Sequence, residues 1–315
     1  MLLTPEVLTI LILNGIFALL GIVAFVLSIR IYLGWNIEST LPLQYKLEKD
    51  SFLASTIIKY IFSVKVPLFL FFVFALDKIS NVITGAMCAA GVVDATQIGM
   101  SLIVLKIINL YLFAYWLRLH SQDMTDKNQP YTKLKFGLFI GLFFLFIVEV
   151  VLEIFMFSSI EINKMVSCCG SIYSSSSTSA ISTLFTLDTS LLLALFYGNY
   201  LLIVLFYFLK NRYIFTLLNI IFIPVSLISL ILFFGTYIYE LPSHHCPFCY
   251  LQSDYYYVGY LIYFLLFVGT FYGLVVSFVE ESKVSYKVSL LFNSLYVILL
   301  TMYVVIYYVK NGVLL

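Results

Sequence analysis

Residues 214–238 read IFTLLNIIFIPVSLISLILFFGTYI. About 20 predominantly apolar residues in a helix suffice to cross the hydrocarbon core of a bilayer. This stretch exceeds that length without one charged side chain, and residues 257–279 form a second such stretch. Their apolar residues are continuous and do not alternate at every second position, which favours membrane-spanning helices over the strands of a barrel.

The same criterion finds six further spans along the chain. They are residues 7–29, 54–76, 98–117, 136–158, 188–209 and 288–309. The first has no basic n-region and no small-residue cleavage site, so it is not expected to be a removed signal peptide. The sequence therefore predicts an all-α, polytopic integral membrane protein in which Met1–Leu315 forms a single domain of eight transmembrane helices.

The composition excludes several classes of protein. Of 315 residues, 63% are hydrophobic and only 10% are charged, and the mean hydropathy is +1.06. Soluble domains are about half apolar and roughly a quarter charged. A soluble globular protein and a disordered chain are thus excluded, and a net charge of +1 provides no field for nucleic acid. The expected partner is the lipid bilayer.

The basic residues predict an orientation, because cytoplasmic loops carry an excess of Lys and Arg. Twelve of the 17 fall on one side, eleven in the connections after the first, third, fifth and seventh spans and Lys59 at the start of the second span, and three fall on the opposite side. This asymmetry predicts that both termini are extracytoplasmic. The expected location is a bacterial-type inner or plasma membrane.

With that orientation, every cysteine lies outside the cytoplasm. The three extracytoplasmic loops are residues 77–97, 159–187 and 239–256. They contain all five cysteines, namely Cys88, Cys168, Cys169, Cys246 and Cys249. Packing alone would scatter cysteines through the helices, whereas an oxidising compartment is where disulfides persist. The arrangement therefore points to thiol chemistry.

The most specific motif is Ser-His-His-Cys-Pro-Phe-Cys at residues 243–249. Cys246 and Cys249 can close a small disulfide ring, and protonated His244 or His245 would favour the reactive thiolate. The two imidazoles and two thiolates can instead form a tetrahedral site for a soft metal ion. A disulfide that only staples the loop remains a third reading. Haem c attachment is not expected, because Tyr250 replaces the required histidine.

The other cysteines extend the redox reading. Adjacent Cys168 and Cys169 can form only a strained disulfide, and strained disulfides exchange readily. They can also chelate a soft ion, or each can pair elsewhere. Cys88 lies among small residues that let the backbone pack closely, in a segment that reads equally well as a short packed or interfacial one.

Apart from residues at the span ends, such as Lys59 and Asp188, four charged residues fall inside the predicted spans. Lys65 and Lys106 lie near the middle of residues 54–76 and 98–117, and Glu149 and Glu153 share one face of residues 136–158. Charges in a bilayer are costly unless they face protein or water. We expect the lysines to pair with the glutamates, either as an intramembrane charge relay or as a structural ion pair.

Small and aromatic residues give weaker signals. Gly137 and Gly141, and likewise Gly269 and Gly273, form G-x-x-x-G patterns that permit close helix contacts. Tyrosines gather at the start of the seventh span, at positions 250, 255, 256, 257, 260 and 263. They predict an interfacial aromatic belt, with a wall for a flat quinone as the alternative.

These features lead to one main functional hypothesis and two alternatives. Cysteine pairs 246/249 and 168/169, with Cys88 as a resolving thiol, predict a membrane thiol–disulfide oxidoreductase. Its partner would be an extracytoplasmic thiol or disulfide protein, and a quinone would be a candidate cofactor. The alternatives are a protein that binds or transports a soft metal or thiol solute with the same Cys/His cluster, and a structural subunit embedded among other membrane subunits.

The arrangement of two outer cysteine pairs resembles in outline the quinone-linked disulfide-generating membrane proteins. Those proteins are four-helix bundles, whereas eight spans are expected here, and this chain has no arginine near its outer cysteines. The Cys-Pro-Phe-Cys motif also resembles the active sites of thioredoxin-type proteins. No strand–helix–strand unit surrounds it in this sequence, so the thioredoxin fold is not expected.

Overall fold

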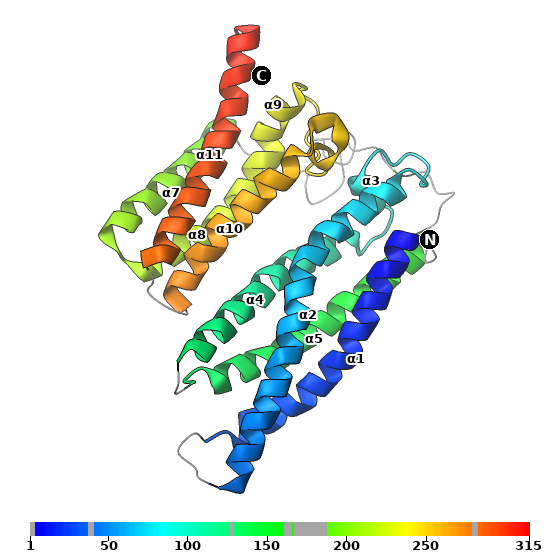
Figure 1. Cartoon of the computed structure of the whole chain (residues 1–315). Coiled ribbons are helices and arrows are strands. Elements are labelled where there is room, and N and C mark those ends of the chain that lie inside the picture. Colours follow the sequence, from blue (N-terminus) through cyan, green and yellow to red (C-terminus); the bar gives the residue numbers. More distant parts are fainter. Residues whose placement is uncertain (1–3, 37–40, 127–128, 161–165, 167–187, 279–282) are drawn as a thin grey trace. The chain divides into compact units, whose positions relative to one another are not determined.

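The computed structural model describes residues 4–36, 41–126, 129–160, 166, 188–278 and 283–315. Regular secondary structure in these residues is entirely helical (Figure 1). Eight segments are long and apolar enough to cross a membrane: Pro5–Gly34, Pro42–Ser80, Gly99–Thr125, Thr132–Ser159, Thr189–Leu209, Arg212–Tyr239, Val258–Ser277 and Lys283–Asn311. They coincide with the eight expected spans, so the all-α integral membrane class is confirmed. The sides on which the termini lie stay a prediction.

Contacts divide the chain into two compact units. Unit 1 comprises Met1–Lys78 and Ala95–Ile162, and unit 2 comprises Ile79–Asp94 and Asn163–Leu315. The long helices of unit 1 are α1 (Pro5–Gly34), α2 (Pro42–Ser80, of which the last two residues belong to unit 2), α4 (Gly99–Thr125) and α5 (Thr132–Ser159). A single domain over the whole chain stays a prediction.

Aromatic side chains fill the core of unit 1. Helix α5 packs against both α1 and α4. Phe62 of α2 stacks on Phe113 of α4 with ring centroids 4.3 Å apart, and its edge meets Trp116 at 5.5 Å. The contact between α2 and α4 is therefore made by large aromatic rings.

A buried polar anchor joins the facing ends of α4 and α5. The carboxylate of Asp123 accepts hydrogen bonds from Lys135 Nζ at 2.6 Å, Thr132 Oγ1 at 3.0 Å and the Tyr131 backbone N–H at 2.8 Å. Trp116 Nε1 donates to the backbone oxygen of Lys135 at 2.8 Å. These contacts fix α5 against α4 and thereby set the positions of the glutamates farther along α5.

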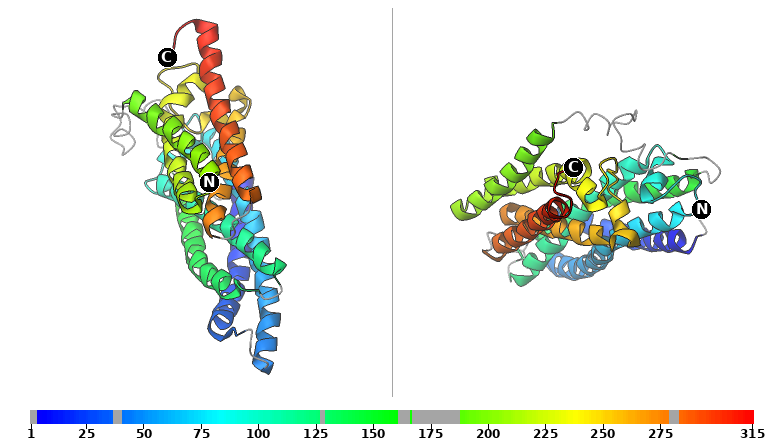
Figure 2. Two further views of the ribbon diagram at one scale, coloured as in Figure 1. Left: turned by 90° about the vertical axis from the view of Figure 1, so that its left-hand side faces the viewer. Right: turned by 90° about the horizontal axis from the view of Figure 1, so that it is seen from above.

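Unit 2 is built around four long helices that run side by side (Figures 1 and 2). They are α7 (Thr189–Leu209), α8 (Arg212–Ser229), α10 (Val258–Phe278) and α11 (Lys283–Asn311). Helix α8 continues through the π-helical turn η2 (Leu230–Phe234) into α9 (Gly235–Tyr239). The short elements are α3 (Ala89–Asp94) and the 3₁₀ turns η3 (Cys249–Leu251) and η4 (Ser253–Tyr255).

The glycine pair of α10 accepts asparagine side chains from its neighbours. A Cβ added to Gly269 would lie 2.2 Å from Asn293 Oδ1, and one added to Gly273 would lie 2.2 Å from Asn219 Cγ. Asn293 Nδ2 donates to Asn219 Oδ1 at 2.9 Å. The close contact expected at this G-x-x-x-G pattern is confirmed, and its purpose is to bury amides of α8 and α11 together.

The second glycine pair behaves differently. A Cβ added to Gly137 would lie 2.8 Å from the Tyr32 ring, whereas one added to Gly141 would have no atom within 4 Å among the described residues. The prediction of a close helix contact at Gly141 is therefore wrong. A spacing of four places both glycines on one face of α5, but only one of them meets a neighbouring side chain.

Candidate functional site

Unit 2 brings three cysteines together at one point. Cys88 directly precedes α3, Cys246 lies in the connection after α9, and Cys249 begins η3. Their Sγ atoms all lie within 4.8 Å of one another, and Cys88 Sγ is 3.5 Å from Cys246 Sγ. The exposed fractions are 0% for Cys88, 1% for Cys246 and 6% for Cys249. We call these three residues the thiol cluster.

Buried tyrosines hold the backbone of the Cys-x-x-Cys loop. Tyr239, the last residue of α9, donates its hydroxyl to the backbone oxygen of Cys246 and accepts the Tyr250 backbone N–H at 3.1 Å. Tyr263 of α10 donates to the backbone oxygen of Pro247 at 2.7 Å, and its hydroxyl lies 2.8 Å from that of Tyr250. Burial raises the pKa of Tyr250 well above its ordinary value, so this phenol stays protonated.

The tyrosines near α10 thus divide into two groups. Tyr250 and Tyr263 brace the loop from inside, whereas Tyr256 is 92% exposed. The bracing hydrogen bonds were not foreseen from the sequence, because a run of tyrosines at a span end looks like an interfacial belt throughout. The belt itself, and the quinone wall, stay predictions.

The segment that carries Cys88 is tied to the same loop. Gln252 Nε2 donates to the backbone oxygen of Met87 at 3.2 Å, and the Gly91 backbone N–H donates to that of Cys88 at 3.0 Å. A Cβ on Gly91 would lie 2.8 Å from Ala86 Cβ. The small residues around Cys88 therefore do allow the close backbone packing that the sequence predicted.

The histidines of the motif make other contacts. His245 Nδ1 lies 3.0 Å from the backbone oxygen of Ile231 in η2, and the His244 ring meets the edge of Tyr239 with centroids 4.3 Å apart. Cys88, and neither histidine, completes the close group of potential ligand atoms among the described residues. A metal site of His244, His245, Cys246 and Cys249 stays a prediction. Cys168 and Cys169 lie outside the described residues.

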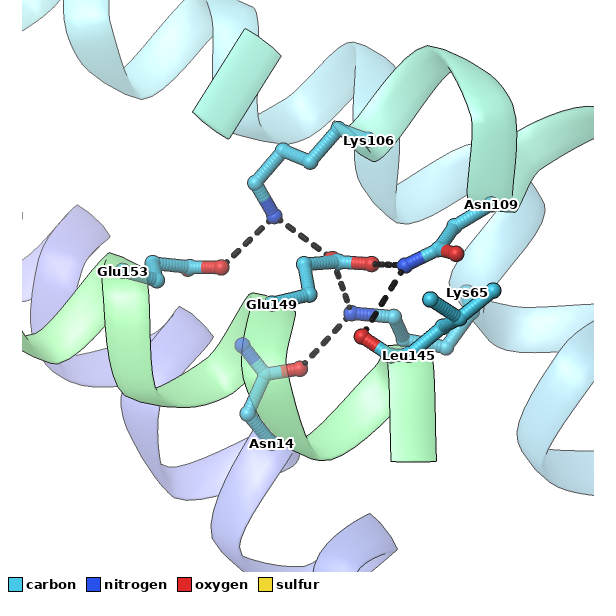
Figure 3. Close-up of polar contacts among 7 residues, drawn as sticks. All are labelled: Asn14, Lys65, Lys106, Asn109, Leu145, Glu149 and Glu153. Carbon is cyan, nitrogen blue, oxygen red and sulfur yellow. Dashed lines mark hydrogen bonds and ion pairs between the residues drawn. The ribbon is translucent and has the colours of Figure 1, made fainter. Parts of the chain in front are cut away.

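Unit 1 contains a second candidate site, made of the four charged residues inside the spans (Figure 3). Lys65 Nζ and Lys106 Nζ each lie 2.8 Å from Glu149 Oε1, and Lys106 Nζ lies 2.6 Å from Glu153 Oε2. All four side chains are buried. The expected pairing of lysines with glutamates is confirmed, and their role as a relay stays a prediction. We call Lys65, Lys106, Glu149 and Glu153 the charge cluster.

Two asparagines complete this arrangement, and the sequence analysis missed both. Asn14 of α1 accepts a hydrogen bond from Lys65 Nζ at 3.1 Å, and Asn109 of α4 donates to Glu149 Oε2 at 2.6 Å. A lone asparagine in an apolar span was the available signal, because an amide in hydrocarbon needs a partner. Four helices of unit 1 therefore meet at one polar centre.

We compared the chain with models of known protein families, with curated proteins and with solved structures, and no significant match was found.

Proposed function

We propose that this integral membrane protein exchanges thiols and disulfides through the thiol cluster. The observation that carries the proposal is the 3.5 Å contact between Cys88 Sγ and Cys246 Sγ. This distance exceeds the ~2.05 Å of a disulfide bond and is a contact from which a thiolate can attack. A third cysteine in contact with a Cys-x-x-Cys pair gives a disulfide two alternative positions.

The proposed reaction begins with the disulfide of an extracytoplasmic partner protein. Cys249 is the most exposed of the three, and its thiolate attacks one partner sulfur, which releases the other as a thiolate. The Cys246 thiolate then attacks the Cys249 sulfur, so the Cys246–Cys249 bond forms and the second partner thiolate leaves. The partner gains two electrons and this protein loses two.

The disulfide then moves inward. The Cys88 thiolate attacks the Cys246 sulfur, a Cys88–Cys246 bond forms, and Cys249 leaves as a thiolate that can react again. This step changes no net oxidation state. The surrounding protein supports it by position: Tyr239 holds the Cys246 backbone, and Gln252 holds the residue that precedes Cys88.

Trapping the inner disulfide tests this order of events. We would place Cys249→Ser in a chain that also carries Cys168→Ser and Cys169→Ser, purify it in lipid nanodiscs and oxidise it with glutathione disulfide. Mass spectrometry of the digested protein should find a Cys88–Cys246 linkage. The matched Cys246→Ser protein cannot form this linkage, because it lacks one of the two sulfurs that lie 3.5 Å apart. Persistent glutathionylation of Cys246 in the Cys249→Ser protein would contradict the proposal.

Catalysis needs its own assay, because cross-linking reports only proximity. The protein with all five cysteines should accelerate the oxidation of a dithiol peptide by glutathione disulfide, which is released as two molecules of glutathione. Cys246→Ser should abolish the acceleration, since Cys246 takes part in both disulfides. Equal rates for the two proteins would contradict a role of the thiol cluster in exchange.

A soft-metal site is the second candidate, and the mutual distances favour it specifically. Zinc–sulfur bonds of about 2.3 Å at tetrahedral angles separate two sulfurs by about 3.8 Å, which is close to the spacing in the thiol cluster. Metal analysis of protein purified without chelator distinguishes the two. Stoichiometric zinc or copper that is lost in Cys88→Ser, with thiols protected from alkylation until chelator is added, would favour metal binding over exchange.

The extracytoplasmic position of the thiol cluster is part of the proposal. Tyr256, in the same connection as Cys249, is 92% exposed, and Tyr45 on α2 is 77% exposed. In a chain whose five native cysteines are replaced by serine, a membrane-impermeant thiol reagent should label Tyr256→Cys on intact cells. It should label Tyr45→Cys only after lysis, because the basic residues place that connection in the cytoplasm. The reverse pattern would overturn the orientation.

A further inference from the structure

The two carboxylates of the charge cluster are stabilised unequally. Glu149 Oε1 accepts hydrogen bonds from Lys65 Nζ and Lys106 Nζ, each at 2.8 Å, and Oε2 accepts one from Asn109 Nδ2 at 2.6 Å. Among the described residues, Glu153 accepts a hydrogen bond only from Lys106 Nζ, at 2.6 Å on Oε2. Glu149 therefore has the partners that keep a buried carboxylate ionised, whereas Glu153 has a single one.

One oxygen of Glu153 stands without a partner. The residue is 0% exposed, and its Oε1 atom has no hydrogen-bond partner within the part of the chain that the structure describes. A buried ionised oxygen with no donor costs free energy that a neutral carboxyl group does not incur to the same degree. Of the two carboxylates, Glu153 is thus the one for which a proton relieves an uncompensated charge.

A small cavity lies beside the other members of the cluster. The centre of a water molecule has about 10 Å³ to occupy there, and the walls include Lys65, Lys106 and Glu149. That is room for about one water. Each ammonium can donate three hydrogen bonds. Lys65 donates to Asn14 and Glu149, and Lys106 donates to Glu149 and Glu153. The third N–H of each lysine has no hydrogen-bond acceptor among the described residues, and Lys106 Nζ lies 4.2 Å from the centroid of the Phe72 ring, which also lines the cavity.

We propose that Glu153 is an intramembrane proton-binding site and that Glu149 is the lasting counter-ion of the two lysines. Binding converts the Glu153 carboxylate to a carboxylic acid, and the charge of the cluster changes from zero to +1. Among the described residues, the charged groups that face Glu153 are Lys106 of α4 directly, and Lys65 of α2 and Glu149 of α5 across the cluster; α1 contributes the Asn14 amide.

The net charge of unit 1 therefore depends on whether Glu153 binds a proton, at the place where its four long helices meet. The excess positive charge of the protonated form is carried by lysines that line a water-sized cavity, which lowers the cost of burying it. This inference is independent of the thiol chemistry, because it uses residues of unit 1 alone.

Labelling with a hydrophobic carbodiimide tests the proposal on the unaltered protein. Carbodiimides add to protonated carboxyl groups, and a hydrophobic one reaches those in the membrane. After reaction in nanodiscs and digestion, mass spectrometry should place the adduct on Glu153 and not on Glu149. Its yield should fall as the pH rises. An adduct on Glu149 instead, or no adduct on Glu153 at any pH, would overturn the assignment.

Infrared difference spectroscopy between acidic and alkaline samples provides the second test. The protein should show a carboxylic-acid C=O band on acidification that shifts in D₂O and is absent from Glu153→Gln. In the matched Glu149→Gln protein the band should persist but need more acid, because Glu153 is then the only counter-ion of two lysines. A band that survives in Glu153→Gln and is lost in Glu149→Gln would show that Glu149 is the proton site. Circular dichroism of both variants checks that the helices are retained.

Discussion

Replacing Lys106 by methionine should destabilise unit 1 strongly and in a way that a second substitution repairs. Lys106 makes two buried ion pairs, at 2.8 Å to Glu149 and 2.6 Å to Glu153. Methionine keeps the length of the side chain but leaves Glu153 with no cation. Removing one partner of a buried ion pair costs about 3–5 kcal/mol, mostly because the other charge is left buried and uncompensated.

The double variant Lys106→Met/Glu153→Gln removes that stranded charge. Lys65 and Glu149 still pair at 2.8 Å, so the remaining cost is the loss of hydrogen bonds to charged groups, about 1.5–3 kcal/mol. The double variant should therefore be more stable than Lys106→Met alone. Acidification should reduce the deficit of the single variant, because a protonated Glu153 has no charge to strand.

The measurement is reversible unfolding in mixed micelles, followed by helical circular dichroism as the share of denaturing detergent rises. The free energy of unfolding is compared among the original protein, both single variants and the double variant at alkaline and acidic pH. A Lys106→Met protein within about 1 kcal/mol of the original at alkaline pH would refute the reasoning. So would a double variant no more stable than Lys106→Met.

Two further predictions concern Gly273 and Tyr250 of unit 2. Gly273→Ala should destabilise the protein, because its Cβ would lie 2.2 Å from Asn219 Cγ. Gly141→Ala in α5 of unit 1 is the matched control, and it should leave stability unchanged or raise it, because no described atom lies within 4 Å of the added Cβ. Thermal unfolding of both variants checks this. Tyr250→Phe should lose the 2.8 Å contact with the Tyr263 hydroxyl and lower the free energy of unfolding by about 1 kcal/mol. Burial raises the pKa of Tyr250 above its value in the unfolded chain. The stabilisation that the Tyr250 phenol provides is therefore complete below about pH 10, and it is lost at higher pH because the phenol then ionises in the unfolded chain. The original protein should therefore lose stability there by up to about 1.4 kcal/mol per pH unit more than Tyr250→Phe, and equal slopes would contradict this.

The charge cluster was the part of the sites that sequence reasoning reached best. Bilayers exclude charge so strongly that two lysines and two glutamates within spans have few options besides one another. Their pairing followed from that rule, and the spacing of four placed Glu149 and Glu153 on one face of α5. What the rule omits is which carboxylate has more donors, because one donor to Glu149 is the amide of Asn109 on α4.

The thiol cluster shows a different limit. The spacing within residues 243–249 identified the Cys-x-x-Cys pair, but the pairing of Cys88 with it links positions 158 residues apart. Local patterns contain no information on such a contact. The same holds for Tyr239 and Tyr263, whose hydrogen bonds to the loop depend on where α9 and α10 end relative to it.

The membrane class and the eight spans follow from the amino-acid sequence alone, because the cost of placing polar groups in hydrocarbon acts on each segment separately. Which side chains meet is visible only in the folded protein: Cys88 with Cys246, Asn219 and Asn293 against the glycines of α10, and, among the described residues, one donor for Glu153 against three for Glu149. These contacts depend on the rotation and register of packed helices. Many side chains from distant segments set that packing together, and no local pattern expresses it.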